Sequence, residues 1–546
     1  MPTIENSLTS RLTAAALSAF GVHADPELRT ATRPEFGHFQ SNLPLRLAGP
    51  LGEPPRVLGE RLVDALDVDD LCLPPVLAGA GFVNLTLRPE TLARTVTGHA
   101  AHAHLGVDRP PAPQRVVVDY SSPNVAKQMH VGHLRSTVIG DALVRVLEFA
   151  GHEVLRRNHV GDWGTPFGML LEHLAERGFP DQPDLTVLDD AYRAARRRFD
   201  EEPGFADRAR RRVVDLQGGD VATRVLWERV VAVSAEAFSA TYARLGVRLQ
   251  PGDVLGESHY QDRLQRTVDD LDAFGLLRES DGALCAFPPG LPPVVLRKSD
   301  GGFGYDATDV AALRHRVAVD GADRLVYVVD ARQSLHFDQV FALARAAGWL
   351  PAAVRAEHVA FGTVLGADGR PFKTRDGGTV PLGALLDEAE QRAGSRDVGI
   401  GAVKYADLSS GLGRDYVFDL DRMVGTDGDT GPYLQYAHAR LATLLARAGG
   451  APGPVTVLAH PAELRVAFAL TRFPGVLLGV ARTLEPHRLC GYLHELAVAV
   501  SGFYEACPVL RAEEPARSSR LALCAAARRT LATGLDLLGI AAPDAM

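Results

Sequence analysis

One run, residues 115–164, constrains the fold more than any other part of the chain. It begins with residues 116–120, a short β-branched apolar stretch that is typical of a buried strand. Ser-Ser-Pro-Asn then breaks the strand with turn formers, and from about residue 131 apolar side chains recur at steps of three and four, which predicts a helix with one buried face. Gly151 ends this helix, and residues 153–157 start a second strand. The run therefore predicts a β-loop-α-β unit of a parallel sheet, where ligands bind beyond the carboxyl ends of the strands.

Polar residues gather on the loop and the first helical turn of this unit. His130 and His133 are three residues apart, so both imidazoles can lie on one side of the turn, and Gly132 lets a ligand approach the backbone closely. The free N–H groups of a helix start favour an anion, and Lys127 adds a positive charge nearby. A lone His-x-x-His is most often a solvated helix start, but a second polar loop, His159-Val-Gly-Asp162, follows the next strand. Together the two loops predict a phosphate-binding site.

Length and composition indicate a multidomain globular protein. At 546 residues, with 46% hydrophobic and 23% charged residues, the chain suits two to four soluble domains. Its N-terminus does not look like a signal peptide, and no run of about 18 uncharged apolar residues suggests a membrane span. The five cysteines lack Cys-x-x-Cys spacing, so we expect neither a zinc ribbon nor a disulfide framework, no protein metal site, and a reducing cytoplasm.

Charge gives a weaker indication of partners. The net charge of −9 does not by itself point to a nucleic acid. Seven arginines crowd into residues 196–212, but acidic residues are interleaved with them, and a solvated helix pair explains the cluster equally well.

The pattern divides the chain into three parts. Residues 1–112 resemble a small α/β module that ends in a proline-rich linker. Residues 113–400 hold the phosphate-binding unit, interrupted between about residues 180 and 290 by a largely helical, charged stretch without a sheet signal, as an insertion would be. Residues 401–546 have helical spacing almost throughout, and a helical bundle on such a domain usually serves a macromolecular partner.

The second half of the middle part predicts more of the sheet and of the site. Strand-like runs that suit parallel βαβ units occur at residues 294–297, 325–329 and 358–361. Polar groups follow or open the neighbouring elements at residues 305–309 and 330–336, where helix capping is the simpler explanation of Asp309 alone.

A glycine-bounded loop, residues 366–380, carries three cations, Arg370, Lys373 and Arg375. A mobile loop that brings positive charge onto a polyphosphate would have this composition, and so would an ordinary basic β-hairpin.

These residues resemble a known family. His130-Val-Gly-His133 is similar to the HIGH signature of class I aminoacyl-tRNA synthetases, and the wider run resembles the arginyl-tRNA synthetases in particular. Further segments match that family's pattern in order along nearly the whole chain: residues 36–42, 122–127, 133–137, 158–164, 330–337, 372–375, 431–440, 503–508 and 535–539.

The resemblance implies a fold and an activity. The fold would be a Rossmann-type α/β catalytic domain with a parallel sheet and helical insertions, between an N-terminal tRNA-binding α/β domain and a C-terminal all-helical anticodon-binding domain. The enzyme would activate L-arginine with ATP to arginyl-adenylate and transfer it to the 3′-terminal adenosine of tRNA(Arg), with tRNA needed for activation. Mg²⁺ would arrive with the substrate, and the protein would be a cytoplasmic monomer without a membrane partner.

The resemblance also implies roles for individual residues. The arginine pocket would be formed by Asp119, Asn124, Tyr305, Asp309 and Gln333. ATP would be bound by His130, Gly132, His133, His159, Gly161, Asp162 and Lys373, and the catalytic residues among these and their neighbours would be His130, His133, Lys127 and Lys373. The tRNA would be contacted by Phe36, Gln40, Asn42, Tyr433, Tyr436 and Arg440.

The chemistry of the substrate agrees with this pocket. A guanidinium offers five donors in a rigid fork, and carboxylates such as Asp309 and Asp119 are its natural acceptors. A pocket of this kind should reject lysine and citrulline, because a buried carboxylate would be left badly paired. Which acid meets the guanidinium and which meets the α-ammonium is left open by the sequence.

The chain departs from the class pattern at one place. It has no Lys-Met-Ser-Lys-Ser loop, and Arg370-Pro-Phe-Lys373-Thr-Arg375-Asp376 is similar to the degenerate loop of this family, with Arg370 and Asp376 where relatives often have lysine and serine. An acid beside a phosphate-binding cation could weaken its field, and Lys127 could supply part of the missing charge. Three alternatives stay open: a second-copy supplier of arginyl-tRNA to a biosynthetic or resistance pathway, a tRNA-binding paralogue that does not charge, and a nucleotidyltransferase with a small acceptor.

Overall fold

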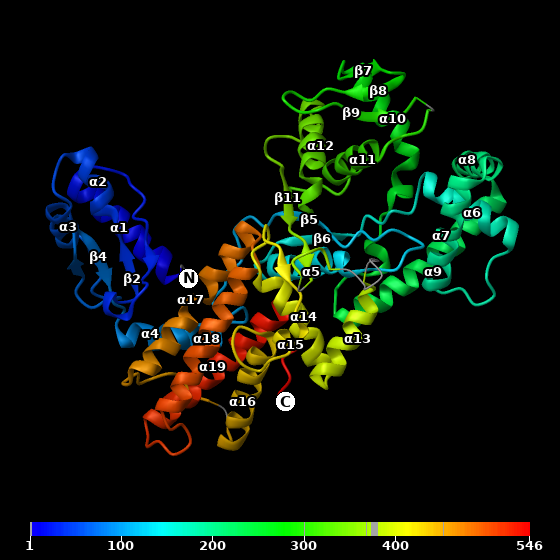
Figure 1. Cartoon of the computed structure of the whole chain (residues 1–546). Helices are drawn as coiled ribbons and strands as arrows, with labels where there is room; N and C mark the ends of the chain where they lie inside the picture. Colours follow the sequence, from blue (N-terminus) through cyan, green and yellow to red (C-terminus); the bar gives the residue numbers. More distant parts are fainter. Residues whose placement is uncertain (1–2, 300, 367, 373–379, 451) are drawn as a thin grey trace.

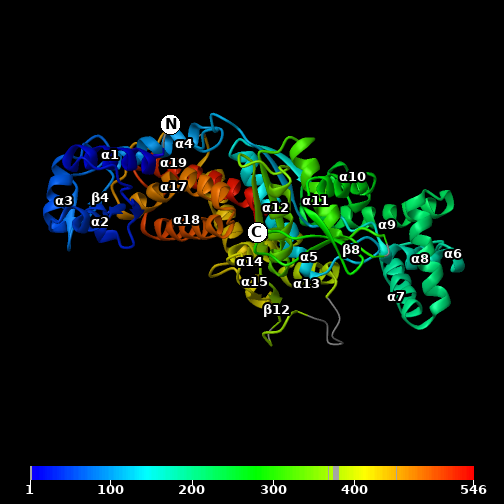
Figure 2. The ribbon, with the colours of Figure 1, turned by 90° about the horizontal axis from the view of Figure 1, so that it is seen from above.

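The molecule is elongated, with a small α/β module at one end, a parallel sheet near the middle and a helical insertion at the other end (Figure 1). A bundle of C-terminal helices lies between the small module and the sheet, as Figure 2 shows from above. This computed structural model describes residues 3–299, 301–366, 368–372, 380–450 and 452–546.

The N-terminal module is the α/β unit that the sequence predicts. Its sheet has the order β1-β2-β4-β3 and is antiparallel at every pairing. The strands are β1 (Arg29–Thr30), β2 (Phe39–Ser41), β3 (Val76–Ala78) and β4 (Phe82–Leu85). The helices are α1 (Ile4–Phe20), α2 (Leu43–Leu51), α3 (Pro55–Asp64) and α4 (Pro89–Ala101), of which α4 packs against the C-terminal helices α17 and α19.

A four-stranded parallel sheet with the order β11-β10-β5-β6 forms the core of the middle part. The strands are β5 (Arg115–Asp119), β6 (Glu153–Arg157), β10 (Arg324–Asp330) and β11 (Arg355–Phe361). Helix α5 (Val131–Phe149) crosses from β5 to β6 as predicted, and α11 (Tyr305–Ala318) and α12 (Ser334–Ala346) flank β10 in the chain. Because β5 pairs with both β6 and β10, the loops after these strands meet at one edge of the sheet, which confirms the predicted Rossmann-type arrangement.

The insertion between β6 and β10 is mainly helical but is not without a sheet. Its helices are α6 (Thr165–Arg177), α7 (Leu185–Glu201), α8 (Pro203–Gly218), α9 (Val221–Leu245) and α10 (Gln261–Ala273). A three-stranded antiparallel sheet follows, made of β7 (Leu277–Ser280), β8 (Ala283–Ala286) and β9 (Val294–Arg297).

Two sequence expectations about this region are wrong. Residues 277–286 do form strands, and residues 294–297 pair with β8 and not with the parallel sheet. The missed signal is Asp281-Gly282, where both residues have positive φ (50° and 73°), the geometry of a tight hairpin turn.

The arginine cluster is in large part neutralised within this insertion, since Arg208 and Arg212 both pair with the buried carboxylate of Glu172.

The C-terminal part is helical, as predicted. Its elements are α13 (Leu382–Ala393), α14 (Arg396–Ser409), α15 (Leu420–Met423), α16 (Gly431–Ala448), α17 (Pro461–Thr483), α18 (His487–Ala506) and α19 (Ala516–Leu537), with the short parallel pair β12 (Val364–Leu365) and β13 (Tyr416–Val417). Residue 401, the boundary expected from the sequence, falls inside α14.

Among the described residues, only α17 is long and apolar enough by composition to cross a membrane, but 56% of its most apolar window is buried inside the protein. It packs against α18, α19, α4 and α5, which is how the core helix of a bundle behaves.

Helix α5 is fixed to the helical part by a buried arginine near its start. Arg135 and Asp407 of α14 are almost wholly buried, with Nε 3.4 Å from Oδ1. Arg135 Nη1 also donates to the carbonyl oxygens of Gly362 and Arg414, at 2.9 and 3.1 Å. The helix that carries the two histidines is therefore anchored one turn behind them.

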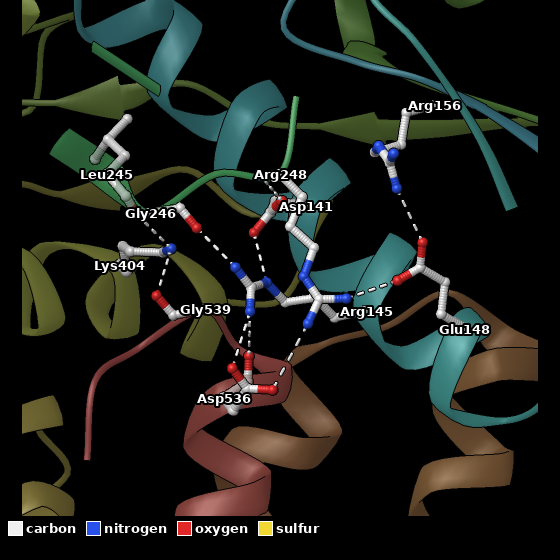
Figure 3. A network of polar contacts seen from close by, with 10 residues as sticks. All are labelled: Asp141, Arg145, Glu148, Arg156, Leu245, Gly246, Arg248, Lys404, Asp536 and Gly539. Carbon is white, nitrogen blue, oxygen red and sulfur yellow. Dashed lines mark hydrogen bonds and ion pairs between the residues drawn. The ribbon is translucent and has the colours of Figure 1, made fainter. Parts of the chain in front are cut away.

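A second buried arginine anchors α5 further along (Figure 3). Arg145 donates from Nε to Asp141 at 2.7 Å, from Nη1 to Asp536 at the end of α19 at 3.0 Å, and from Nη2 to the Gly246 carbonyl at 2.6 Å. Lys404 of α14 lies beside this group and donates to the carbonyl oxygens of Leu245 and Gly539. Helices α5, α9, α14 and α19 therefore meet at one polar node.

Candidate active site

The side chains of His130 and His133 cap backbone N–H groups at the start of α5. The Nδ1 atom of His130 accepts from the Gly132 N–H at 3.0 Å, and Nδ1 of His133 accepts from the His130 N–H at 3.1 Å. Burial lowers the pKa of His130, and burial together with the neighbouring His130 lowers the pKa of His133 to about 3. Both imidazoles are therefore neutral at neutral pH, and since Nδ1 accepts, the proton of each ring is on Nε2. Two neutral N–H donors suit a phosphate oxygen.

The segment that follows the basic loop, residues 366–380, is bonded to this helix start. Lys373, Arg375 and Asp376 lie outside the described residues. The chain that follows them is fixed to the histidine turn, because the Val131 N–H donates to Val380 O at 3.1 Å and the Leu382 N–H donates to Met129 O at 2.9 Å. The chain that follows the loop therefore lies beside the histidine turn, and the role of Lys373 stays a prediction.

The loop after β5 is held in a strained form by the insertion. Ser121, Ser122 and Ala126 have φ values of 74°, 46° and 63°, which side chains other than glycine adopt only at a cost. Two hydrogen bonds from α9 offset part of this conformational cost. The Tyr242 hydroxyl bonds Ser121 Oγ at 2.8 Å, and Ser234 Oγ accepts from the Ala126 N–H at 3.0 Å. Helix α9 thereby shapes the loop.

This loop places Asn124 against the second polar loop. The Val125 N–H donates to Gly161 O at 3.0 Å, and Asn124 forms a parallel bridge with Gly161. A side chain at Gly161 would overlap the amide oxygen of Asn124, so another residue there would displace the Asn124 side chain.

A carboxylate–histidine–carboxylate group lies on the facing helices. His336 of α12 stands between two aspartates of α11, with Nδ1 2.9 Å from Asp306 Oδ1 and Nε2 2.6 Å from Asp309 Oδ2. Burial alone would lower the pKa of His336, but the two carboxylates raise it to about 9. His159 Nε2 lies 3.5 Å from the other oxygen of Asp309. With His336 charged, the three residues carry one net negative charge, which suits a cationic ligand.

Two acids that the sequence assigns to ligands have internal partners. Asp119 Oδ2 accepts from Arg316 Nη2 at 2.7 Å, and both side chains are buried. Asp162 accepts from the N–H and the hydroxyl of Ser258, at 2.9 and 2.6 Å, while burial raises its pKa. The contacts of Asp119 with arginine and of Asp162 with ATP stay predictions. In the structure, Asp119 holds α11 through Arg316, and Asp162 holds Ser258.

A cavity of about 890 Å³ is lined by the loop after β5, the second polar loop, the start of α11 and helices of the insertion. Its wall includes Asn124, Lys127, Gly161 and Tyr305 of the predicted set, and Glu257 and Thr308 beside them. Lys127 Nζ lies 4.4 Å from the centre of the Tyr192 ring on α7. Gln333 is exposed at the start of α12, and the Tyr305 ring lies 5.1 Å from that of His336. Of the five residues predicted to bind arginine, Asn124 and Tyr305 line this cavity, and the roles of all five stay predictions.

Three family models match the chain and together span most of it. The class I tRNA synthetase (R) catalytic domain matches residues 99–420, the arginyl-tRNA synthetase N-terminal domain residues 3–87, and the DALR anticodon-binding domain residues 434–546. The arginine–tRNA ligase of Cutibacterium acnes is 54% identical over 558 residues, which cover 99% of this chain and 100% of that protein. The chain belongs to the arginyl-tRNA synthetase family. The arginine–tRNA ligase of Frankia casuarinae is 51% identical, covering 96% of this chain and 95% of that protein.

Solved structures agree with this membership. The arginyl-tRNA synthetase of Thermus thermophilus is 29% identical with a TM-score of 0.85, and that of Plasmodium falciparum is 26% identical with a TM-score of 0.87. Both superpose over 100% of this chain and 100% of their own chains. The predicted family, fold class and enzyme class are thereby confirmed.

The residues expected to contact tRNA lie on two separate parts of this synthetase. Tyr436 and Arg440 of α16 line a pocket of about 240 Å³ together with Tyr504 and the C-terminal Met546, and the Arg440 guanidinium lies 3.7 Å from the centre of the Tyr504 ring. The Tyr433 side chain does not line this pocket, and its hydroxyl bonds Ser501 Oγ at 3.2 Å.

Phe36, Gln40 and Asn42 lie on the N-terminal module. Gln40 donates to Asn84 at 2.8 Å, and the amide oxygen of Asn42 is buried without a hydrogen-bond partner among the described residues. Their contacts with tRNA stay predictions.

Residues that sequence reasoning did not assign complete the site. His336 and Asp306 hold Asp309, Glu257 faces the cavity, and Tyr242 supports the strained loop. His336 lies in a segment that matches the family pattern, yet nothing in its spacing reveals that its partners are some thirty residues earlier. For Glu257 and Tyr242 we find no signal in the single sequence.

Proposed function

We propose that the chain ligates L-arginine to the 3′-terminal adenosine of tRNA(Arg) in two steps, with ATP as the source of energy. The observation that carries the proposal is an acid pocket for a cation, Asp309 with its His336 and Asp306 partners, at the same sheet edge as two neutral histidines suited to phosphate. The experiment that tests it is the charging of labelled arginine onto tRNA by the purified chain.

In the first step the carboxylate oxygen of arginine attacks the α-phosphorus of ATP, and diphosphate leaves with the electron pair of the broken P–O bond. No covalent bond to the enzyme is needed, so catalysis consists of positioning and charge stabilisation. Nε2–H groups of His130 and His133 donate to the phosphate, and Lys127 with Lys373 adds positive charge. Mg²⁺ prefers oxygen ligands, so we place it on the phosphates of ATP, where it neutralises the leaving group.

In the second step a ribose hydroxyl of the terminal adenosine attacks the carbonyl carbon of the adenylate, and AMP leaves. The cavity of about 890 Å³ has room for a nucleoside beside the amino acid. Asn124, Tyr305, Asp309 and Gln333 hold the arginine, with Asp119 acting through Arg316 on the position of α11. His159, Gly132, Gly161 and Asp162 support the nucleotide side.

The tRNA is held at two further places in this proposal. The pocket of Tyr436 and Arg440 has the stacking faces and the cation that a splayed-out base requires. The N-terminal module, residues 1–112, and the helical part next to it, residues 401–546, bind tRNA outside the catalytic part, residues 113–400. Activation depends on bound tRNA, and the enzyme works as a cytoplasmic monomer.

Replacement of Lys127 by alanine should lower the rate of arginine-dependent ATP–diphosphate exchange by a factor of ~100, the scale of one lost electrostatic donor. Lys127 lies on the cavity wall with its ammonium over Tyr192, between the arginine and phosphate sides of the site. The matched control is Arg197→Ala, which removes an exposed cation from α7. An unchanged exchange rate in the Lys127 variant would show that its charge does not serve activation.

A further inference from the structure

A buried lysine joins the ends of two helices that belong to different parts of the chain (Figure 3). Lys404 of α14 is fully buried, and its Nζ donates to Leu245 O, the last residue of α9, at 2.9 Å. The same ammonium donates to Gly539 O, just beyond the end of α19, at 2.6 Å. The carbonyl groups at a helix C-terminus carry the negative end of the helix dipole, so one cation stabilises both ends.

The α19 end continues into the C-terminal tail, residues 538–546, which lies on α16. Gln435 of α16 donates to Ala541 O at 2.9 Å, and His438 Nδ1 lies 3.0 Å from Pro543 O. The last tail residue, Met546, lines the pocket on α16 that the proposed function assigns to tRNA. A base that enters this pocket therefore contacts the tail whose start Lys404 holds.

The α9 end supports the loop that carries Asn124. In the last turn of α9, the Tyr242 hydroxyl bonds Ser121 Oγ at 2.8 Å and accepts from Asn158 Nδ2 at 3.0 Å. Asn158 Oδ1 in turn accepts from the Ser122 N–H at 3.0 Å. Ser121 and Ser122 both have positive φ, so these bonds hold the loop in a conformation that its own backbone disfavours.

We propose that Lys404 is a positioning residue, which links the C-terminal tail to the loop of Asn124, so that a tRNA base in the α16 pocket tightens the binding of L-arginine. The inference rests on the proposed function, since it gives a route from the tRNA to the arginine site of the same enzyme.

The strained loop supplies the element that has two forms. A base in the pocket fixes the tail, and the fixed tail holds the Lys404 ammonium against the α9 end. Helix α9 then keeps Tyr242 on the loop, and the strained form that presents Asn124 to arginine is favoured. When the α9 end moves away, the bonds of Tyr242 are lost and the backbone strain is released, so arginine binds less well.

Calorimetric titration of the full chain with L-arginine, without ATP and with or without saturating tRNA(Arg), measures this link. We expect tRNA to tighten the binding of arginine to the unaltered enzyme by about 5- to 150-fold, the usual range of coupling between two sites. Lys404→Met keeps an unbranched side chain but removes the ammonium, so the tRNA effect should fall to about twofold or less. The affinity of this variant for tRNA in the absence of arginine should stay unchanged.

Arg396→Met is the matched control for this variant. Arg396 is an exposed cation of the same helix α14, and it donates to Ala243 O and Arg244 O at the same end of α9, at 3.3 and 3.2 Å. Both bonds join α14 to α9 alone, so this variant should keep the full tRNA effect. Equal loss of the effect in Arg396→Met overturns the inference, since any damage to the α9 end would then suffice.

A full tRNA effect in folded Lys404→Met also overturns the inference, because the tRNA would then act on arginine by another route, such as direct contact through its 3′ end. If Lys404→Met does not fold, Tyr242→Phe removes only the hydroxyl that holds the loop and must lose the tRNA effect. A folded Tyr242→Phe variant that keeps the effect overturns the inference as well.

The unaltered enzyme separates this inference from the proposed function. An enzyme that charges arginine onto tRNA but binds arginine equally well with and without tRNA contradicts only the inference. An enzyme that charges no arginine contradicts the proposed function.

Discussion

Asp309→Asn should reduce kcat/KM for arginine in ATP–diphosphate exchange by roughly 1,000-fold or more, the scale seen when a site built around a polar contact loses it. Asparagine has the shape of aspartate but removes the charge, so the guanidinium loses its anionic acceptor while the cationic His336 remains beside it. In the native site burial opposes ionisation, yet the hydrogen bond from His336 and the charge of His159 hold the pKa of Asp309 below its usual range. The carboxylate is therefore ionised at neutral pH.

Asp338→Asn is the matched control for this variant, because Asp338 is exposed on α12 close to His336. We expect it to leave both KM and kcat unchanged. Should Asp309→Asn activate arginine as well as the unaltered enzyme, the acid pocket of α11 and α12 would not be the arginine site.

Arg145→Met should lower the free energy of unfolding by about 3–5 kcal/mol, the usual cost of removing one partner of a buried ion pair. Methionine fills part of the space but leaves the buried Asp141 without its guanidinium, and it breaks the contacts of α5 with Asp536 and Gly246. Thermal unfolding at fixed protein concentration should show an apparent transition several degrees lower.

Arg196→Met provides the comparison, since Arg196 and Asp200 form an exposed pair one turn apart on α7. Such surface pairs contribute about 0.3–0.5 kcal/mol, so its unfolding transition should hardly move. Equal transitions for the two variants would mean that the node in Figure 3 does not hold the helical part to the catalytic sheet.

Local sequence patterns predicted the structure best. The run from β5 to β6 was predictable because a β-branched strand, turn formers and a helix period follow one another within fifty residues. The helical character of the C-terminal part, with α16 to α19, was predictable for the same reason. The β7–β8 hairpin carried an Asp-Gly turn signal that the charged helical surroundings concealed.

Pairings between distant residues could not be predicted. Strand β9 has the apolar pattern of a parallel strand, and only its pairing with β8 shows that it belongs to another sheet. The partner of Asp119 is Arg316, 197 residues later, and Arg145 meets Asp536 391 residues later. The family resemblance named Asp309 as a ligand, but a single sequence does not contain the distances that place His336 and Glu257 beside it.

Aminoacylation by the full chain shows whether it charges tRNA with arginine. Purified protein with ATP, Mg²⁺ and arginine-accepting tRNA should attach radiolabelled arginine, and the other nineteen amino acids should not compete. Exchange between ATP and diphosphate should appear only when tRNA is added. Absence of charging under these conditions, with the protein folded and tRNA bound, would contradict the account and leave a tRNA-binding protein without ligase activity.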